Sequence, residues 1–196
     1  LLLIFLMTVS FSNSQQTSDD SVDIDAPIIE NIDAEENLLD SNEVYKEQFD
    51  SLSKEGEWIE ANKSEFLRDL SLETGEDLDD NYPSTTEIVY LWRPYSANAN
   101  WNPYYNGSWV FSSYGWVWAS SYNWGWAPYN YGRWFCSNYY GWVWLPGNVW
   151  ASNWVNWRQY NNYVGWYPVC PRVHWRHNNK FYTNKKFVSH PDKWIV

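Results

Sequence analysis

Acidic residues are missing from most of the second half of this 196-residue chain: no Asp or Glu occurs between residues 88 and 191. Hydrolysis of a glycosidic bond by general acid–base catalysis normally requires two positioned carboxyl groups, and this stretch supplies none. The chain also lacks a nucleophile elbow, a phosphate-binding loop and a dinucleotide-binding fingerprint. These absences predict a protein that is not an enzyme and that uses no cofactor.

Cysteine is scarce as well. The chain has Cys136 and Cys170, and a disulfide between them and two separate buried thiols are both compatible with the sequence. The spacing of Cys170, His174 and His177 could hold a metal ion. Two arginines stand among these residues and disfavour a bound cation. Surface histidines are the preferred interpretation, and no metal site is predicted.

The sequence has no apolar run long enough to cross a bilayer, which needs about 20 residues. The apolar run Leu1–Val9 fits the core of a secretory signal, and Ser12-Asn13-Ser14 matches a small-residue cleavage site,. Residues 1–14 are therefore predicted to be the remnant of a signal peptide, the alternative being a buried first strand. The protein is expected to be exported, to the periplasm or to the cell surface or extracellular space, with no transmembrane span.

Charge and tryptophan are unevenly distributed along the chain. Residues 1–87 hold 23 of the 24 acidic residues and 4 of the 13 basic ones, whereas residues 88–196 hold one acidic and nine basic residues. Of the 17 tryptophans, 16 lie at or after Trp92. The acidic composition of the whole chain therefore hides a basic, aromatic half.

The first half divides into three parts. Residues 15–42 are acidic and almost free of aromatics, which predicts a disordered linker. A short helix is expected over Asn42–Leu52, because apolar side chains follow at helical spacing at Tyr45, Phe49 and Leu52,. The β domain predicted for residues 43–196 is interrupted by an acidic stretch, residues 61–87, which is interpreted as an insertion with one or two helical turns.

The aromatic half contains an internal repeat. Residues 107–118 read GSWVFSSYGWVW and residues 132–144 read GRWFCSNYYGWVW. Each unit is a β-rich run, a turn of Ser, Asn, Tyr and Gly, and a second β-rich run, which predicts a β-hairpin. Both units begin with Gly-x-Trp and an apolar residue, a pattern also found at residues 56–59. Gly115 and Gly141 fall at the turns, where a positive φ is expected.

Strand geometry predicts how these aromatic rings are used. Alternate residues of a strand face opposite sides, so Trp116 and Trp118 are expected to share a face, as are Trp142 and Trp144. An aromatic side chain buries on the order of 150–250 Å², and a domain of this size cannot cover all of its rings. The other residues assigned to the structure of the repeats are Trp58, Trp92, Arg93, Gly107, Trp109, Gly115, Gly132, Arg133, Trp134, Gly141, Trp150, Trp154, Trp157, Gly165 and Trp166.

The order of these motifs resembles that of a known family. The motifs include Trp92-Arg93-Pro94-Tyr95, Trp124-Gly125-Trp126-Ala127-Pro128, Tyr131-Gly132-Arg133-Trp134 and Gly141-Trp142-Val143-Trp144. The chain is similar, over about Phe49 to its end, to an uncharacterised bacterial family of exported proteins with a domain of unknown function. The resemblance implies secretion into the bacterial envelope and no established activity.

Two features of the chain depart from that family. About 27 residues, the acidic stretch 61–87, separate the first Gly-x-Trp unit from Trp92, whereas the family usually runs directly from one to the other. Asn130 stands where the family often has a histidine, so no role of that histidine carries over to this chain.

The fold expected is all-β, a meander of short repeated hairpins that form a small sheet, a sandwich or a barrel, with the disordered acidic region and the short helix before it. The function expected is a non-catalytic binding module of the cell envelope. Its partners would be cell-wall or extracellular polysaccharide, with acidic chains preferred because residues 88–196 are basic. Candidate contacts are aromatic residues of the less regular links, Trp124, Trp126, Tyr129, Tyr160 and Tyr163.

The alternative is a structural or protein-interaction protein of the envelope, with envelope proteins as partners and with mainly structural aromatics. Aromatic and basic surfaces also bind single-stranded nucleic acid, but export argues against that partner. Exposed aromatic rings gathered on one face would favour the polysaccharide, and complete burial would favour the structural role.

Overall fold

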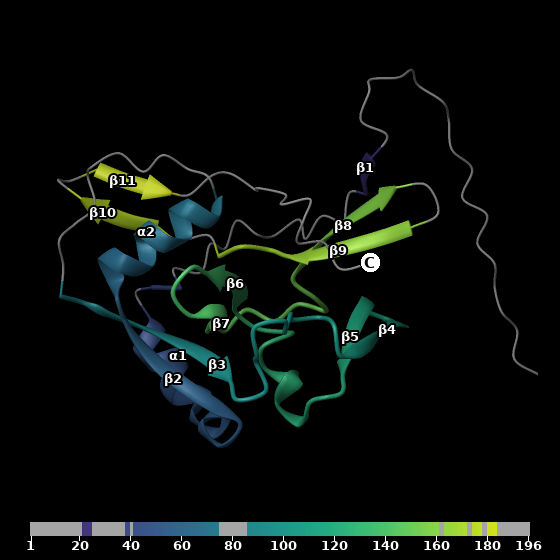
Figure 1. Ribbon diagram of the computed structural model, residues 1–196, viewed down its shortest axis with the longest axis horizontal. Helices are drawn as coiled ribbons and strands as arrows, with labels where there is room; N and C mark the ends of the chain where they lie inside the picture. The colour runs from purple at the N-terminus through teal and green to yellow at the C-terminus, as the bar shows by residue number, and fades with distance from the viewer. Residues whose placement is uncertain are drawn as a thin grey trace, which may run out of the picture.

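The computed structural model describes residues 21–24, 38–39, 41–74, 86–160, 163–171, 174–177 and 180–183. The first elements are β1 (Ser21–Ile24), the helix α1 (Asn42–Gln48), the 3₁₀-helix η1 (Asp50–Lys54), β2 (Gly56–Asn62), the helix α2 (Lys63–Thr74) and β3 (Ile88–Pro94). There follow β4 (Gly107–Ser112), β5 (Gly115–Ser120), the 3₁₀-helix η2 (Asn123–Trp126), β6 (Arg133–Ser137), β7 (Gly141–Leu145), β8 (Val155–Tyr160), β9 (Tyr163–Pro168), β10 (His174–His177) and β11 (Lys180–Thr183), as Figure 1 shows.

The strands form small antiparallel sheets. The largest has four strands in the order β2-β3-β7-β6, and β1, β8 and β9 form another in the order β1-β8-β9. Two hairpins, β4–β5 and β10–β11, are two-stranded sheets of their own. The sheets of the described residues do not close into a barrel. The all-β class is confirmed, and the two sequence repeats are the hairpins β4–β5 and β6–β7.

No helix within the described ranges has the length and apolar character needed to cross a membrane. The predicted signal peptide, residues 1–14, lies outside those ranges.

One face of the four-stranded sheet is covered by α2. Phe66, Leu67 and Leu70 are buried there against apolar side chains of the sheet. The ring of Phe66 meets that of Phe135 edge-on at 5.4 Å. The helix has 12 residues, about three turns, and so exceeds the one or two turns expected within residues 61–87. Its apolar positions recur on one side, which gives the helix a face to bury.

The structured part of the chain begins earlier than the sequence indicated. Leu38 and Leu39, placed in the expected linker, are buried in the same aliphatic cluster. The Asn42 side chain accepts a hydrogen bond from the Tyr90 backbone N–H at 2.5 Å and donates one to the Tyr90 carbonyl at 3.1 Å. The strand β1, also within residues 15–42, pairs with β8. The remaining residues of that range lie outside the described part of the chain.

The opposite face of the sheet carries a row of four tryptophans, one from each strand. The strand register places Trp58 opposite Trp92 and Trp144 opposite both Trp92 and Trp134. The ring centroids of Trp92 and Trp144 are 6.4 Å apart, and those of Trp92 and Trp134 are 6.3 Å apart. Trp92, Trp134 and Trp144 are fully buried. This row is the centre of an aromatic cluster distinct from the aliphatic one beneath α2.

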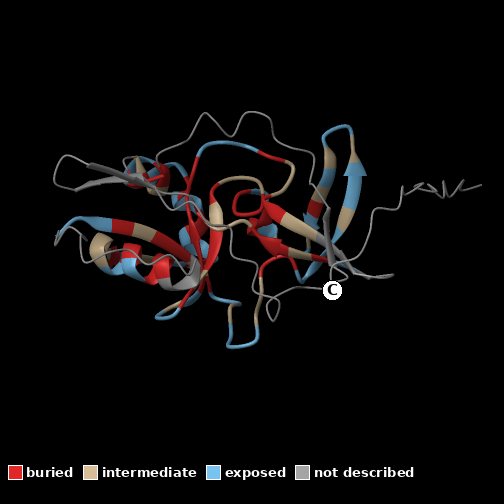
Figure 2. Ribbon diagram, turned by 90° about the horizontal axis from the view of Figure 1, so that it is seen from above, coloured by how far each residue is buried: buried red, intermediate tan, exposed pale blue. Residues whose placement is uncertain are grey.

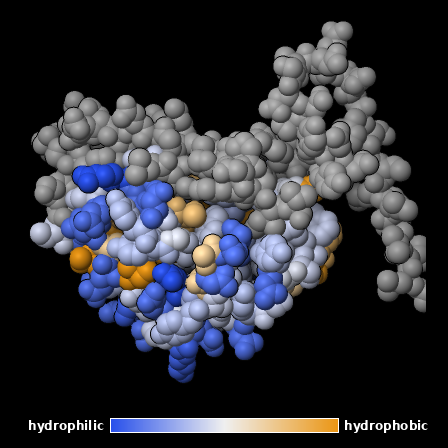
Figure 3. Space-filling model, viewed as in Figure 1, coloured by the Kyte–Doolittle hydropathy of each residue, from blue (hydrophilic) through white to orange (hydrophobic). Residues whose placement is uncertain are grey.

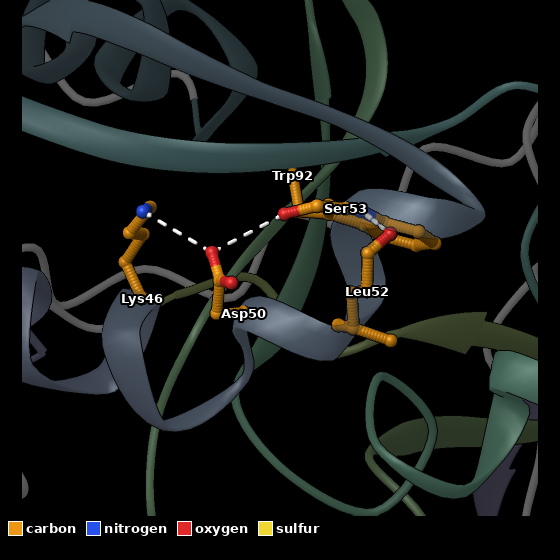
Figure 4. Close-up of polar contacts among 5 residues, drawn as sticks. All are labelled: Lys46, Asp50, Leu52, Ser53 and Trp92. Carbon is orange, nitrogen blue, oxygen red and sulfur yellow. Dashed lines mark hydrogen bonds and ion pairs between the residues drawn. The ribbon is translucent and has the colours of Figure 1, made fainter.

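The two short N-terminal helical segments close the aromatic cluster on one side. The sequence predicted one helix over residues 42–52, whereas the structure breaks it at Phe49 into α1 and η1. Within η1 the Leu52 carbonyl accepts a hydrogen bond from the Trp92 indole N–H at 3.1 Å (Figure 4). Asp50 holds the segment by accepting hydrogen bonds from Lys46 at 3.4 Å and Ser53 at 3.3 Å (Figure 4).

Candidate functional site

The β4–β5 hairpin reaches out from the body of the molecule (Figure 2). Trp118 is its one buried residue, and the other residues of the two strands are half-buried or exposed. A short turn joins the strands. The Ser112 hydroxyl accepts a hydrogen bond from the Tyr114 backbone N–H and donates one to the Gly115 carbonyl, each at 3.1 Å. Gly115 has φ +84°, the conformation expected for it, since glycine adopts positive φ without steric cost.

The base of the hairpin is held by rings. Trp109 and Trp118 face each other across the strands with centroids 5.1 Å apart. Trp109 stacks on buried Tyr104 with an interplanar angle of 8° and lies 4.5 Å from the ring of Trp157. These contacts anchor the hairpin to the aromatic cluster and to the β8–β9 hairpin, so its exposed tip projects from a rigid base.

At the tip, four aromatic side chains emerge together. Phe111 is 70% exposed and its ring lies 5.3 Å from that of Trp116, which is 48% exposed. Tyr114, 71% exposed, lies 5.3 Å from Trp150, 44% exposed. We call Phe111, Tyr114, Trp116 and Trp150 the aromatic end.

Two segments that are distant in sequence build the aromatic end. Trp150 belongs to the link between β7 and β8, and the other three residues belong to the hairpin. Asn153 ties the link to the hairpin, because its side-chain amide donates a hydrogen bond to the Trp116 carbonyl at 2.7 Å. The outward backbone edge of β5 is thereby occupied at Trp116. The four rings are therefore two contacting pairs, Phe111 with Trp116 and Tyr114 with Trp150, which the hairpin and the link bring to the same end of the molecule.

The aromatic end carries no ionised side chain at neutral pH. Residues 94–132 and 134–157, which contain the whole surface, have no Asp, Glu, Lys, Arg or His. Figure 3 shows hydrophobic colour along the edge of the molecule over β4 and β5. Its polar groups are neutral hydroxyls and amides, among them those of Ser113, Asn148 and Asn153. Exposed apolar patches edged by polar groups mark binding surfaces in soluble proteins.

The structure separates the residues that the sequence proposed as ligand contacts. Trp124 is 4% exposed and Tyr129 is fully buried, so neither presents a ring to a ligand in this structure. Trp126 is 55% exposed but packs beside Phe49 at 6.0 Å, next to η1. Tyr160 and Tyr163 end β8 and begin β9 as a facing pair, so they belong to a hairpin and not to an irregular link. The side chains of these two residues lie outside the described part of the chain.

Most residues assigned to the repeat structure do pack inside. Trp118, Trp142 and Trp154 are buried, and Trp58, Trp109, Trp157 and Trp166 pack against the aromatic cluster. Several of these indole N–H groups donate hydrogen bonds within the protein. The Trp144 indole donates to the Tyr131 carbonyl and the Trp142 indole to the Asn102 side-chain oxygen. The Trp154 indole donates to the Asn130 carbonyl and the Trp166 indole to the Tyr104 carbonyl. In the described residues the buried indole N–H groups of Trp58, Trp109, Trp118 and Trp134 have no hydrogen-bond partner. Trp116 and Trp150 had also been assigned to the structure of the repeats, but both are exposed.

The two arginines of the repeats are engaged within the fold. The Arg133 guanidinium lies 3.1 Å above the ring of Trp154, a cation–π contact,, and donates to the Gly132 carbonyl at 2.8 Å. Arg93 forms an ion pair with Glu57 at 3.8 Å across β2 and β3. Gly165 is buried opposite Arg158 in the β8–β9 hairpin. Both arginines therefore act as structural contacts, as the sequence repeat indicated for Arg133.

Beneath the hairpin lie two buried phenols. Burial raises the pKa of Tyr104 well above its ordinary value, and burial likewise raises the pKa of Tyr129. Both groups are neutral at physiological pH. The Tyr104 hydroxyl donates to the Tyr129 carbonyl at 3.2 Å and accepts from the Trp154 backbone N–H at 3.3 Å, which joins the hairpin base to the β7–β8 link.

No group of three or more His, Cys, Asp or Glu side chains assembles a metal site among the described residues. Cys136 and Cys170 are thiols, half-buried at the border of the aromatic cluster. The structure has no disulfide between them, and both are half-buried rather than buried as the second alternative had it.

Sequence reasoning missed Phe111 and Tyr114 altogether and placed Trp116 and Trp150 among structural residues. Two signals could have found them. Tyr114 lies in a predicted hairpin turn, which is normally at the surface, and the surrounding sequence is free of charge. An exposed hairpin tip without charged residues would then have been expected to carry its rings on the surface.

Residues 77–173 match the model of a family of unknown function, DUF6600. The matched stretch runs from just before β3 to just after β9 and contains the whole aromatic end. It is shorter than the resemblance expected from about Phe49 to the chain end, since β2 and α2 precede it and residues 174–196 follow it. No curated protein and no solved structure matches the chain.

Proposed function

We propose that this protein is a non-catalytic binding module of the bacterial cell envelope, and that its aromatic end holds polysaccharide. The observation that carries the proposal is the gathering of Phe111, Tyr114, Trp116 and Trp150, each 44% to 71% exposed, at one projecting end. The apolar run Leu1–Val9 supports export,. Residues 88–191, without a carboxylate side chain, support a binding role over hydrolysis,.

A sugar ring presents an apolar face of C–H groups and a rim of hydroxyls. Exposed aromatic rings pack against such faces and remove apolar area from water, at about 25 cal/mol per Å². Neighbouring neutral polar groups, such as the exposed Ser113 hydroxyl, supply hydrogen bonds to the rim. The rigid base formed by Trp109 and Trp118 keeps the rings in place before binding, which lowers the entropy lost on association.

A polysaccharide pull-down tests this function. The protein is incubated with insoluble cellulose, chitin and purified cell-wall sacculi, and the retained fraction is measured against an agarose blank. Tyr114→Ala, at the tip of the β4–β5 hairpin, is compared with Tyr139→Ala, an equally exposed tyrosine (64%) in the turn of the β6–β7 hairpin. We expect retention of the parent and of Tyr139→Ala, and about tenfold weaker binding of Tyr114→Ala, the equivalent of 1.4 kcal/mol.

Polysaccharide binding would be contradicted if none of these polymers retained the parent protein, or if the two variants were retained equally. The second candidate function, contact with envelope proteins or with a second copy, would then lead. One observation favours it: β4 is an edge strand of a two-stranded sheet, without charged residues, and such edges pair readily with other chains. Sedimentation velocity over a range of protein concentrations tests it directly.

A further inference from the structure

We infer that the polysaccharide held by the aromatic end is an uncharged one. The inference rests on the proposed function and names its ligand class. It differs from the sequence-based expectation, which was a preference for acidic chains because residues 88–196 are basic.

The first step is the charge of the surface itself. The four rings come from residues 111–116 and from Trp150, inside the two charge-free stretches 94–132 and 134–157. An anionic sugar laid on these rings would give up water contacts of its carboxylate or sulfate and would find no cation within the aromatic end. Removing water from a charge without supplying a partner is unfavourable, and this cost opposes the gain from stacking.

The second step concerns Arg93 and Arg133, the two basic residues between residues 88 and 157. Arg133 adjoins the β7–β8 link, but its guanidinium lies flat over the Trp154 ring at 3.1 Å and donates to the Gly132 carbonyl. Arg93 is held by Glu57 and by the Tyr140 carbonyl at 3.4 Å. Recruiting either one to an anionic ligand would break contacts that hold the repeats together. The other basic residues of this half begin at Arg158, and their side chains lie outside the described part of the chain.

The third step is the polar lining. Ser113 and Asn148 are exposed and lie within two residues of Tyr114 and Trp150 in the sequence. The Asn153 side chain is engaged by the fold, since it donates to the Trp116 carbonyl and accepts from the Val155 backbone N–H. Neutral hydroxyls and amides donate and accept equally, which suits sugar hydroxyl and acetamido groups. A surface built of rings and neutral polar groups binds without counterion release, so its affinity should be nearly independent of salt.

Two matched pairs of soluble polymers test the ligand class. Each pair shares a backbone and differs in charge: hydroxyethyl cellulose against carboxymethyl cellulose, and dextran against dextran sulfate. Binding of the parent protein, Trp116→Ala, Trp150→Ala and the control Tyr139→Ala is measured by affinity gel electrophoresis at about 20 mM and about 500 mM NaCl, conditions that span strong and weak screening.

We expect at least one neutral polymer to retard the parent protein, with an affinity that changes by less than about twofold between the two salt concentrations. Each tryptophan variant should bind that polymer at least about fivefold more weakly, and Tyr139→Ala should bind it as the parent does. Tighter binding to the charged member of the pair, released by salt and still weakened by Trp116→Ala, would overturn the inference and leave the proposed function standing. Absence of retardation by all four polymers, or equal retardation of the parent and both tryptophan variants, would overturn both.

Discussion

At the scale of single residues, the three Gly-x-Trp motifs share one packing device. A Cβ added to Gly56 would come within 2.5 Å of the Trp92 ring, one added to Gly107 within 2.7 Å of the Trp118 ring, and one added to Gly132 within 2.8 Å of the Trp144 indole nitrogen. In each case the indole of the partner strand lies across the glycine, and the motif's own tryptophan faces that indole in the register. The glycine, which has no side chain, therefore leaves room for the opposing ring.

A comparison of Gly132→Ala with Gly141→Ala tests this device. Both residues have positive φ, +58° and +70°, so alanine costs about 1–2 kcal/mol at either position. A Cβ at Gly141 meets nothing within 4 Å, whereas one at Gly132 collides with the backbone of Leu145 and the ring of Trp144. We expect Gly132→Ala to lose a further 1–3 kcal/mol, roughly the cost of overpacking, in urea denaturation. Equal losses of stability in the two variants would show that the opposing ring does not need the space left by Gly132.

Asp69 is a second residue with a defined structural task. It is 2% exposed on α2 and accepts hydrogen bonds from the Ser137 hydroxyl, from the Asn138 backbone N–H at 2.9 Å and from the Asn138 amide at 2.8 Å. Through these contacts an acidic residue from the predicted insertion fastens the turn of the β6–β7 repeat.

We expect Asp69→Asn to destabilise the protein by about 2–3 kcal/mol, since hydrogen bonds to an ionised group are lost and an amide N–H is placed against donors. The matched control is Glu65→Gln, which removes an exposed carboxylate from the same helix. Thermal unfolding of both variants provides the measurement. A melting temperature for Asp69→Asn close to that of Glu65→Gln would refute the assigned role.

At the scale of elements, α2 is the cover of one sheet face rather than an appendage. Its buried residues Phe66, Leu67 and Leu70 belong to one apolar cluster with residues of the sheet, among them Leu91 of β3 and Phe135 of β6. Residues 61–87 are interpreted from the sequence as an insertion, which implies that the β module folds without them. The packing of α2 argues against it, because removal of the helix would expose this whole face of the sheet to water.

Phe66→Ala is expected to cost about 3–5 kcal/mol, the usual loss for a fully buried phenylalanine. Deletion of residues 61–87 should abolish the cooperative thermal transition, as followed by circular dichroism. Replacement of exposed Arg68 by alanine on the same helix provides the control and should leave the transition near that of the parent. A cooperative melt in the deletion variant would restore the insertion hypothesis.

The hairpins were predictable and the exposure of their rings was not. Alternation and turn residues are local signals, so the β4–β5 and β6–β7 hairpins could be placed to within a few residues. Whether Trp116 is buried depends on what lies above it, which is set by packing between segments far apart in sequence. The link with Trp124 and Tyr129 looked irregular and therefore exposed, yet it folds back through η2 into the aromatic cluster. The acidic character of residues 61–87 similarly obscured the buried face of α2.

At the scale of the whole molecule, two cores of different chemistry lie on the two faces of one sheet. Among the described residues the aliphatic core has no fully buried tyrosine, whereas the aromatic core contains Tyr104 and Tyr129, whose pKa values are raised by burial. An unfolded tyrosine has a pKa of about 10. Above that pH the unfolded chain loses these protons while the folded chain keeps them, so stability falls as pH rises.

The contribution of Tyr104 and Tyr129 to the free energy of unfolding should therefore stay constant up to about pH 9. It should decline from about pH 10 upward. Urea midpoints measured between these limits and about pH 11.5 test this, with tyrosinate absorbance followed in parallel. We expect part of the tyrosinate signal to appear only with unfolding. Titration of every tyrosine before any loss of structure would show that the two phenols are accessible to solvent.

The facing indoles of the hairpins also provide an intrinsic spectroscopic probe of the fold. Trp109 and Trp118 have planes inclined at 67° with centroids 5.1 Å apart, and Trp157 and Trp166 are inclined at 54° with centroids 5.9 Å apart. Chromophores this close and inclined to each other share electronic excitation, which splits their ultraviolet transitions into circular dichroism bands of opposite sign. Because the splitting disappears when the strands part, the ultraviolet spectrum would follow the opening of the hairpins, in a chain whose 17 tryptophans make ordinary fluorescence hard to assign.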